Sequence, residues 1–152
     1  MRQILVPTDF SKEAATALPH VKEQVKLAGS SQVQVILLTV IGDLVPANID
    51  FEFGLALVDT KKLEQEALRR AQERMTQLVA EHFSGMHVEQ KILTARKSVY
   101  DEILTFANDN KVDMIIMATH GRAGFKHLVL GSVTERIVRG ARCPVLVIPA
   151  QS

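Results

Sequence analysis

The chain has 152 residues, 47% of them hydrophobic, which is enough for a single domain, residues 1–152, with a buried core. Its 18 basic and 17 acidic residues leave a net charge of +1, which excludes a general attraction to nucleic acid or to an anionic membrane. The only cysteine, Cys143, excludes an internal disulfide framework and favours a reducing compartment. Because the first residues continue directly into a strand-like segment, and no apolar run is long enough to cross a bilayer, we expect a cytoplasmic protein.

Five short apolar runs alternate with longer amphipathic stretches along the chain. The runs are rich in Val, Ile and Leu, and three are nearly continuous, which is typical of strands buried on both faces. They are Ile4–Val6, Val33–Val40, Val88–Leu93, Met114–Ala118 and Val145–Ile148. This alternation predicts an α/β fold, in which right-handed crossovers build an open parallel sheet with helices on both faces.

The first amphipathic stretch predicts a helix that a proline interrupts. Its apolar residues, at spacings of four, three and four, are Ala14, Leu18, Val21 and Val25. Pro19 lies inside this pattern and removes a backbone hydrogen bond, so it should bend or break the helix at a cost of about 3 kcal/mol.

Three further helices are expected from their apolar faces and end signals. They follow Asp59, begin at Ser98, and extend from Ser132 to about Arg139. In the first of these, Glu66 and Arg70 are spaced for a surface ion pair. The last should be closed by Gly140. The expected core-facing residues are Leu63, Ala67, Ala71 and Met75, followed by Val99, Ile103 and Phe106.

The segment Ile41–Val58 has no clean period and mixes glycine and proline with large apolar residues. Two interpretations remain open. Its apolar side chains could simply pack onto the core, which we favour, or the segment could partly cover a ligand.

The most informative stretch is Ala118-Thr119-His120-Gly121, followed after nine residues by Gly131-Ser132-Val133-Thr134-Glu135. It joins a buried strand to the start of a helix through a loop that contains glycine. Glycine lets backbone N–H groups approach an anion, and a helix start offers N–H donors without intrahelical partners. The stretch from Thr119 to Arg142 also carries a net charge of +4. The pattern therefore predicts an anionic ligand, with a nucleotide as the favoured class.

Two interpretations compete for Ser132 and the residues after it. Ser132 and Glu135 have the spacing of a capping box, which would only start a helix. Alternatively, residues 132–134 present N–H and hydroxyl groups to phosphate oxygens. The nearby glycines and basic residues, which include Arg122 and Lys126, favour the ligand interpretation, and Lys126 could equally be a solvated loop charge.

Short polar residues follow the first strand, in the sequence Pro7-Thr8-Asp9-Phe10-Ser11. Ligands of open parallel sheets bind at the carboxyl ends of the strands, so Asp9 could accept a hydrogen bond from a ribose or an adenine, or help to hold a metal. Equally, Asp9 could only support the start of the first helix, which Ser11 is expected to cap.

The remaining candidates for chemistry are weak. His120 is expected to be a hydrogen-bonding loop residue, and Cys143, which precedes Pro144, is expected to be a buried and inert thiol. The five histidines have no metal-ligand spacing. No Walker lysine motif, G-x-G-x-x-G or G-x-S-x-G is present, which removes the common ATPase, dehydrogenase and hydrolase classes.

Four segments together resemble the universal stress protein family. They are Ile4–Ser11, Met117–Arg122, Leu130–Arg136 and Cys143–Ile148. The resemblance implies an adenine nucleotide alpha-hydrolase-like fold, with five parallel strands in the order 3-2-1-4-5. It also implies a homodimer through the last strand, Val145–Ile148, which would otherwise be an exposed apolar edge.

The resemblance also implies which residues bind a ligand. The ATP-binding branch of the family has the loop G-x-x-G, nine residues, G-[S/T], and this chain keeps the spacing but has Ala118 in place of the first glycine. Thr39 stands where many members have a histidine. The implied adenosine pocket and phosphate site comprise Pro7, Thr8, Asp9, Val40, Met117, Ala118, Gly121, Arg122, Gly131, Ser132, Val133 and Thr134.

The function expected from the resemblance is that of a cytoplasmic stress-response regulator that binds ATP, with or without Mg²⁺, or binds AMP or another adenine nucleotide. It would act on a protein partner, and no residue is placed to activate water. Two alternatives remain open: an interaction module of the same fold that binds no nucleotide, and a slow ATPase or autophosphorylating protein with Ser132 or Thr134 as the acceptor.

Overall fold

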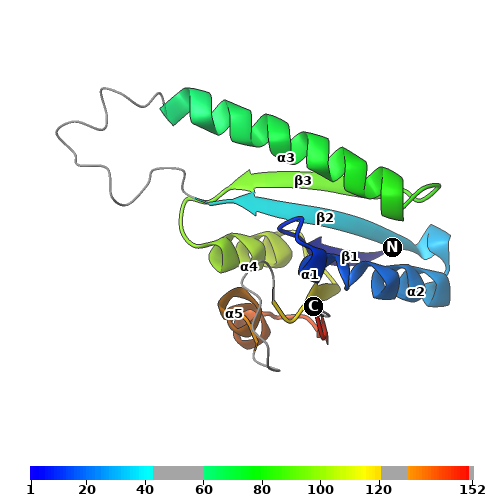
Figure 1. The fold of residues 1–152 in the computed structure, drawn as a ribbon. Coiled ribbons are helices and arrows are strands. Elements are labelled where there is room, and N and C mark those ends of the chain that lie inside the picture. Colours follow the sequence, from blue (N-terminus) through cyan, green and yellow to red (C-terminus); the bar gives the residue numbers. More distant parts are fainter. Residues whose placement is uncertain (43–59, 121–129, 151–152) are drawn as a thin grey trace.

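The computed structural model describes residues 1–42, 60–120 and 130–150, whose five strands form one parallel sheet between two layers of helices (Figure 1). The strands are β1 (Arg2–Pro7), β2 (Val33–Ile41), β3 (Val88–Thr94), β4 (Met114–Ala118) and β5 (Val145–Ile148). Their order is β3-β2-β1-β4-β5, and each neighbouring pair is parallel. The predicted fold class and the strand order implied by the resemblance are both confirmed.

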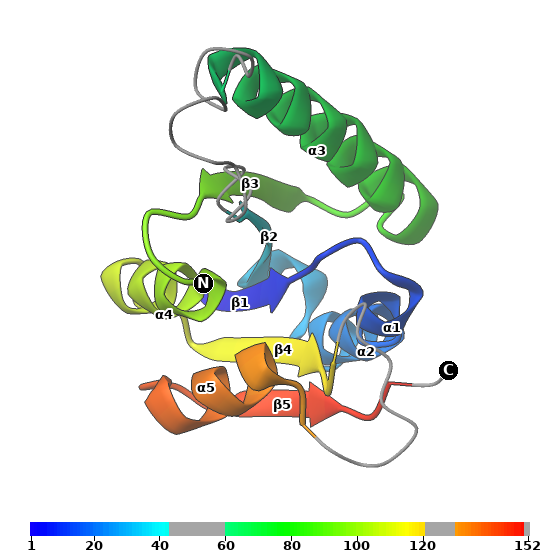
Figure 2. The same ribbon diagram turned by 60° about the vertical axis from the view of Figure 1, so that its left-hand side comes forward.

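The two faces of the sheet are buried against different helices. β1 lies in the centre, where Ile4 pairs with Val35 of β2 and with Met114 of β4. Figure 2 shows helices α2 (Leu18–Ala28) and α3 (Thr60–His82) on one side of the sheet and α4 (Val99–Asp109) and α5 (Ser132–Gly140) on the other. Side chains alternate between the two cores, so nearly every position in the inner strands is apolar, as their continuous runs predicted.

The predicted break at Pro19 is confirmed, and its cause is local. The stretch divides into a short helix α1 (Lys12–Ala15) and the longer α2, with Pro19 in the first turn of α2. The N–H that proline lacks has no intrahelical partner at that position, so the expected cost of about 3 kcal/mol does not arise. Ser11 caps α1 as expected, because its hydroxyl accepts the Ala14 N–H at 3.1 Å.

Helices α3 and α4 follow the predicted patterns with one departure. Ser98 caps α4 by accepting the Asp101 N–H at 3.2 Å, and Glu66 pairs with Arg70 on α3 at 3.1 Å. Leu63 was expected on the buried face of α3 but is 42% exposed. The sheet therefore covers α3 fully only from Ala71 onward.

Gly140 does not terminate the last helix in the way that its position suggests. It is the last residue of α5, and Ala141 is the C-cap residue. A Cβ atom at Gly140 would lie 2.7 Å from Cδ1 of Leu104 in α4, so the glycine permits a close approach of the two helices. The prediction of a glycine terminator is wrong, because Ala141 is the C-cap and Gly140 lacks the left-handed backbone of a terminating glycine.

Among the described residues, no helix combines the length and the apolar character needed to cross a bilayer. Most of the segment Ile41–Val58, on which two interpretations were left open, lies outside the described residues.

Candidate functional site

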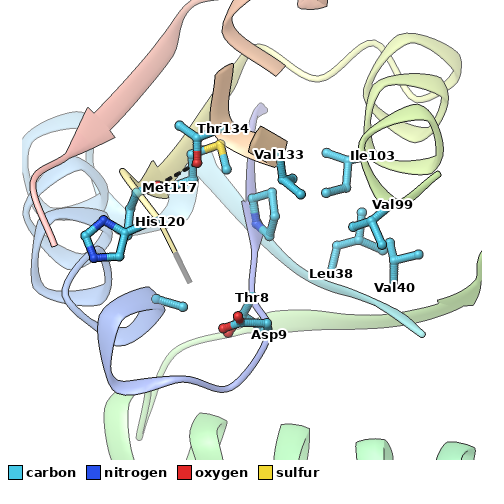
Figure 3. A pocket seen from close by; sticks show the side chains of 13 residues that line it. Thr8, Asp9, Leu38, Val40, Val99, Ile103, Met117, His120, Val133 and Thr134 are labelled. Atoms are coloured by element: carbon cyan, nitrogen blue, oxygen red, sulfur yellow. Dashed lines mark hydrogen bonds between the residues drawn. The ribbon is translucent and has the colours of Figure 1, made fainter. Parts of the chain in front are cut away.

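The candidate site is a cavity of about 280 Å³ at the carboxyl ends of β1 and β4 (Figure 3). These strands are neighbours, and their following connections lead to opposite sides of the sheet, so a crevice opens between them. Its lining residues are Pro7, Thr8, Asp9, Ala14, Leu38, Val40, Val99, Ile103, Met117, Ala118, His120, Val133 and Thr134. The first and fourth strands adjoin, as the strand order implied by the resemblance requires.

One half of the cavity is an apolar slot. Leu38 and Val40 of β2 lie beside Val99 and Ile103 of α4 in Figure 3, and Val133 of α5 also lines the cavity. A slot of aliphatic side chains suits a flat aromatic ring, which gains from burial without needing charged partners. Because parallel strands place every second residue on one face, Leu38 and Val40 point to the same side.

The other half carries the polar residues that follow β1. The Asp9 carboxylate accepts hydrogen bonds from the Ser11 hydroxyl and, at 2.9 Å, from the Ser11 N–H. The Thr8 hydroxyl accepts the Phe10 N–H at 3.1 Å, and Phe10 has a left-handed backbone with φ of 64°. The two interpretations of Asp9 are thus compatible, because the residue supports the α1 cap and also lines the cavity.

Thr39 acts on the site indirectly. Its side chain is buried, and its hydroxyl donates to the Thr8 carbonyl at 2.8 Å. It does not line the cavity, whereas both of its neighbours, Leu38 and Val40, do. Thr39 therefore fixes the end of β1 to β2.

The capping box, one of the two interpretations of Ser132 and Glu135, is not formed. Gly131 is the N-cap residue, with φ of −61° and ψ of 159°, and Ser132 is the first residue of the helix. The Glu135 carboxylate pairs instead with Arg139 at 3.0 Å. Within the part of the chain that the structure describes, the exposed Ser132 hydroxyl has no hydrogen-bond partner. Because Ser132 does not cap the helix, its hydroxyl can bind a ligand without loss of a capping hydrogen bond.

Close packing holds the start of α5 beside the end of β4. The Gly131 N–H donates to the Thr119 carbonyl at 2.8 Å, and a Cβ atom at Gly131 would lie 3.2 Å from Cβ of His120. Thr134 is buried, and its hydroxyl donates to the Ala118 carbonyl at 3.1 Å (dashed in Figure 3). The first-turn N–H groups of α5, which have no intrahelical acceptors, are thus fixed at the rim of the cavity.

Ala118 fits the position where the family pattern has glycine. Its backbone φ is not positive, so the methyl group causes no left-handed strain. The residue is buried in β4 and lines the cavity.

The predicted site residues fall into three groups. Pro7, Thr8, Asp9, Val40, Met117, Ala118, Val133 and Thr134 line the cavity. Gly131 and Ser132 adjoin it at the start of α5 without lining it. Gly121 and Arg122 lie outside the described residues, as does Lys126 of the basic patch.

Five lining residues were not among the predicted site residues: Ala14, Leu38, Val99, Ile103 and His120. For Val99 and Ile103 a signal existed, because both were expected on the buried face of their helix. Which part of that face borders a cavity depends on how α4 packs against β2. The His120 ring forms the expected local contact, with Nδ1 3.2 Å from the Thr119 hydroxyl.

Other reactive groups lie apart from the cavity. Burial raises the pKa of the half-buried Cys143 thiol, and nearby Asp113 adds to the rise, so the thiol stays protonated at neutral pH. In residues 1–42, 60–120 and 130–150, no three His, Cys, Asp or Glu side chains cluster in a way that could hold a metal ion.

This arrangement defines a class of protein: an open parallel α/β domain whose crevice combines an apolar slot with a helix N-terminus. The chain belongs to the universal stress protein family, whose model matches residues 1–149.

Relatives of known structure agree with this assignment. Universal stress protein MJ0577 of Methanocaldococcus jannaschii is 32% identical over 97% of this chain and 94% of its own length. A solved structure of MJ0577 superposes with a TM-score of 0.77 and covers 99% of this chain and 97% of that one. UspA of Lactobacillus plantarum is 26% identical, with a TM-score of 0.67 and 97% coverage of both chains.

More distant structures share the fold and contain adenine nucleotides. One from Arabidopsis thaliana, with AMP bound, is 19% identical, with a TM-score of 0.67 and coverage of 100% of this chain and 94% of that one. One from Archaeoglobus fulgidus, in complex with dAMP, is 19% identical, with a TM-score of 0.60 and coverage of 97% and 98%.

Proposed function

We propose that this protein binds an adenine nucleotide, ATP or AMP, in the crevice at the ends of β1 and β4. The observation that carries the proposal is that an apolar slot and the N-terminus of α5 lie at the same cavity. A nucleotide needs this combination, a dry surface for the base and fixed N–H donors for phosphate. The adenine nucleotides in the distant structures of the same fold add support.

Each part of the nucleotide has a matching part of the cavity. The base would lie in the slot between Val40, Val99 and Ile103, and the ribose would donate a hydroxyl hydrogen bond to Asp9. The phosphates would accept from the first-turn N–H groups of α5 and from the Ser132 hydroxyl. Gly121 and Arg122 are expected to complete the phosphate site.

A magnesium ion fits this site only as a companion of the phosphates. Asp9 is the one carboxylate among the described lining residues, and its carboxylate already accepts from Ser11. Mg²⁺ commonly binds through one carboxylate together with phosphate oxygens and water, so Asp9 would be its protein ligand.

The protein would bind the nucleotide as a regulatory ligand rather than hydrolyse it. The Asp9 carboxylate is engaged at the α1 cap, and the His120 ring contacts Thr119. We therefore propose a cytoplasmic regulator whose nucleotide state alters its binding to a partner protein.

The proposal is tested by titration calorimetry with ATP and AMP. Valine at Gly131 would press on the backbone and Cβ of His120 and displace the start of α5. Gly131→Val should therefore weaken ATP binding at least about tenfold. Gly42→Val is the matched control, because no atom of the described residues lies within 4 Å of a Cβ atom there. Equal ATP affinity in wild type and Gly131→Val would show that the nucleotide site is assigned wrongly.

A further inference from the structure

A second cavity adjoins the nucleotide pocket on the side that faces α3. Its volume is about 600 Å³, and it lies between α3 and the residues that end β1 and β2. The two cavities share Asp9 and Val40. In Figure 3, Asp9 stands on the side of the pocket nearest to α3, drawn in faint green at the bottom. A ligand group that extends past Asp9 would therefore enter the second cavity.

Two guanidinium groups from successive turns of α3 line this second cavity. Arg70 pairs with Glu66 at 3.1 Å, and both side chains are largely exposed, so this pair is weak and exchangeable. Arg74 has no carboxylate partner among the described residues. The charge of Glu73, which also lines the cavity, is balanced by Arg69 at 2.7 Å. Within the described part of the chain, Arg74 thus presents a positive charge that no carboxylate engages in an ion pair.

The loop that carries Asp9 also orients Arg74. The Arg74 guanidinium carbon lies 5.8 Å from the centre of the Phe10 ring, a cation–π distance. The left-handed backbone of Phe10, with φ of 64°, follows directly after Asp9. One short turn therefore sets an acceptor for a ribose hydroxyl beside a cation whose five N–H donors match a phosphate.

We infer that the second cavity is a subsite for a second phosphate, carried on the 2′ or 3′ oxygen of the ribose. The inference rests on the proposed function, since the base and the 5′ phosphate must occupy the first cavity. A phosphate at the ribose replaces a hydroxyl that would donate to Asp9, so contact with this carboxylate alone would disfavour it. Arg74 supplies positive charge and paired N–H donors for this phosphate, and Arg70 adds a second guanidinium in the same cavity. Together they would favour binding of the second phosphate.

The test compares the affinity of the full-length protein for AMP with that for adenosine 2′,5′-bisphosphate and 3′,5′-bisphosphate by calorimetry. The three probes differ only in the added phosphate. The quantity measured is the ratio of the AMP dissociation constant to the bisphosphate dissociation constant. We expect one isomer to give a ratio of at least about five, and Arg74→Gln to return that ratio to about one or below.

Arg2→Gln is the control. It removes an exposed guanidinium at the start of β1, at the opposite end of the strand from Asp9, and Arg2 lines neither cavity, so the ratio should not change. If AMP binds and neither bisphosphate binds more tightly, the subsite is wrong and the nucleotide function stands. A preference that survives Arg74→Gln would also overturn the subsite. If none of the three nucleotides binds, the proposed function fails together with the subsite.

Discussion

Ser132 connects the start of a helix to the proposed chemistry, because it is the first residue of α5, and its side chain is exposed beside the cavity. An acidic residue there should stabilise the helix by about 0.3–1 kcal/mol through the helix dipole. The same charge would repel phosphates, so Ser132→Glu should weaken ATP binding at least about tenfold while the melting temperature holds or rises. Calorimetry and thermal melting together check this. If Ser132→Glu melts as expected but binds ATP with wild-type affinity, the start of α5 does not contact the ligand.

Thr134, which the family pattern implies as a ligand-binding residue, also joins α5 to the end of β4. Its hydroxyl donates to the Ala118 carbonyl in a buried setting, so Thr134→Val should leave that carbonyl without a partner. We expect a loss of about 1–3 kcal/mol in unfolding free energy, measured by urea denaturation. Thr105→Val on the exposed face of α4 is the control, with an expected change below about 0.5 kcal/mol. Equal losses of unfolding free energy in the two variants would show that the hydrogen bond from Thr134 to Ala118 does not stabilise the fold.

At this scale the sequence predicted the cavity residues that belong to strand ends and to the start of α5. It could not assign Leu38, Val99 or Ile103 to the cavity, because their exposure to it is set by how α4 packs on β2. It also could not decide which residue caps α5. The S-x-x-E spacing indicated Ser132 as the cap, whereas the extended backbone of Gly131 makes the preceding residue the cap.

The expected helix break at Pro19 is present, but the expected cost of about 3 kcal/mol is not. The proline ends one helix and begins another, because it occupies the first turn of α2. Pro19→Ala should therefore lower the unfolding free energy by up to about 1 kcal/mol, since the unfolded chain gains freedom. A gain of about 3 kcal/mol in chemical denaturation would instead show that the proline strains a continuous helix.

The strands and most helix starts were predictable because their signals are local. Buried parallel strands give continuous apolar runs, and Ser11 and Ser98 are caps that the side chains themselves specify. Gly140 was misassigned because the approach of Leu104 from another helix leaves no local signal. Leu63 lies on the expected stripe, yet the sheet does not reach it.

At the scale of the whole molecule, β5 is a free edge of the sheet within the described part of the chain. Carbonyls of Pro144 and Ile148 accept from β4, so alternation directs the backbone groups of Val145 and Val147 away from it. We propose that a second copy of the chain pairs with this edge. Val147→Pro should give a folded monomer, measured by light scattering and circular dichroism, because it removes an outward N–H without breaking a bond to β4. A dimer that persists in Val147→Pro would place the interface elsewhere.

The central claim, that the crevice holds an adenine nucleotide, is tested most directly on protein purified without added nucleotide. The protein is denatured, and the released small molecules are separated by chromatography and identified by mass. The structure leads us to expect an adenine nucleotide in near-stoichiometric amount, or an empty protein whose melting temperature rises when ATP or AMP is added. An empty protein whose melting temperature does not respond to either nucleotide would contradict the claim.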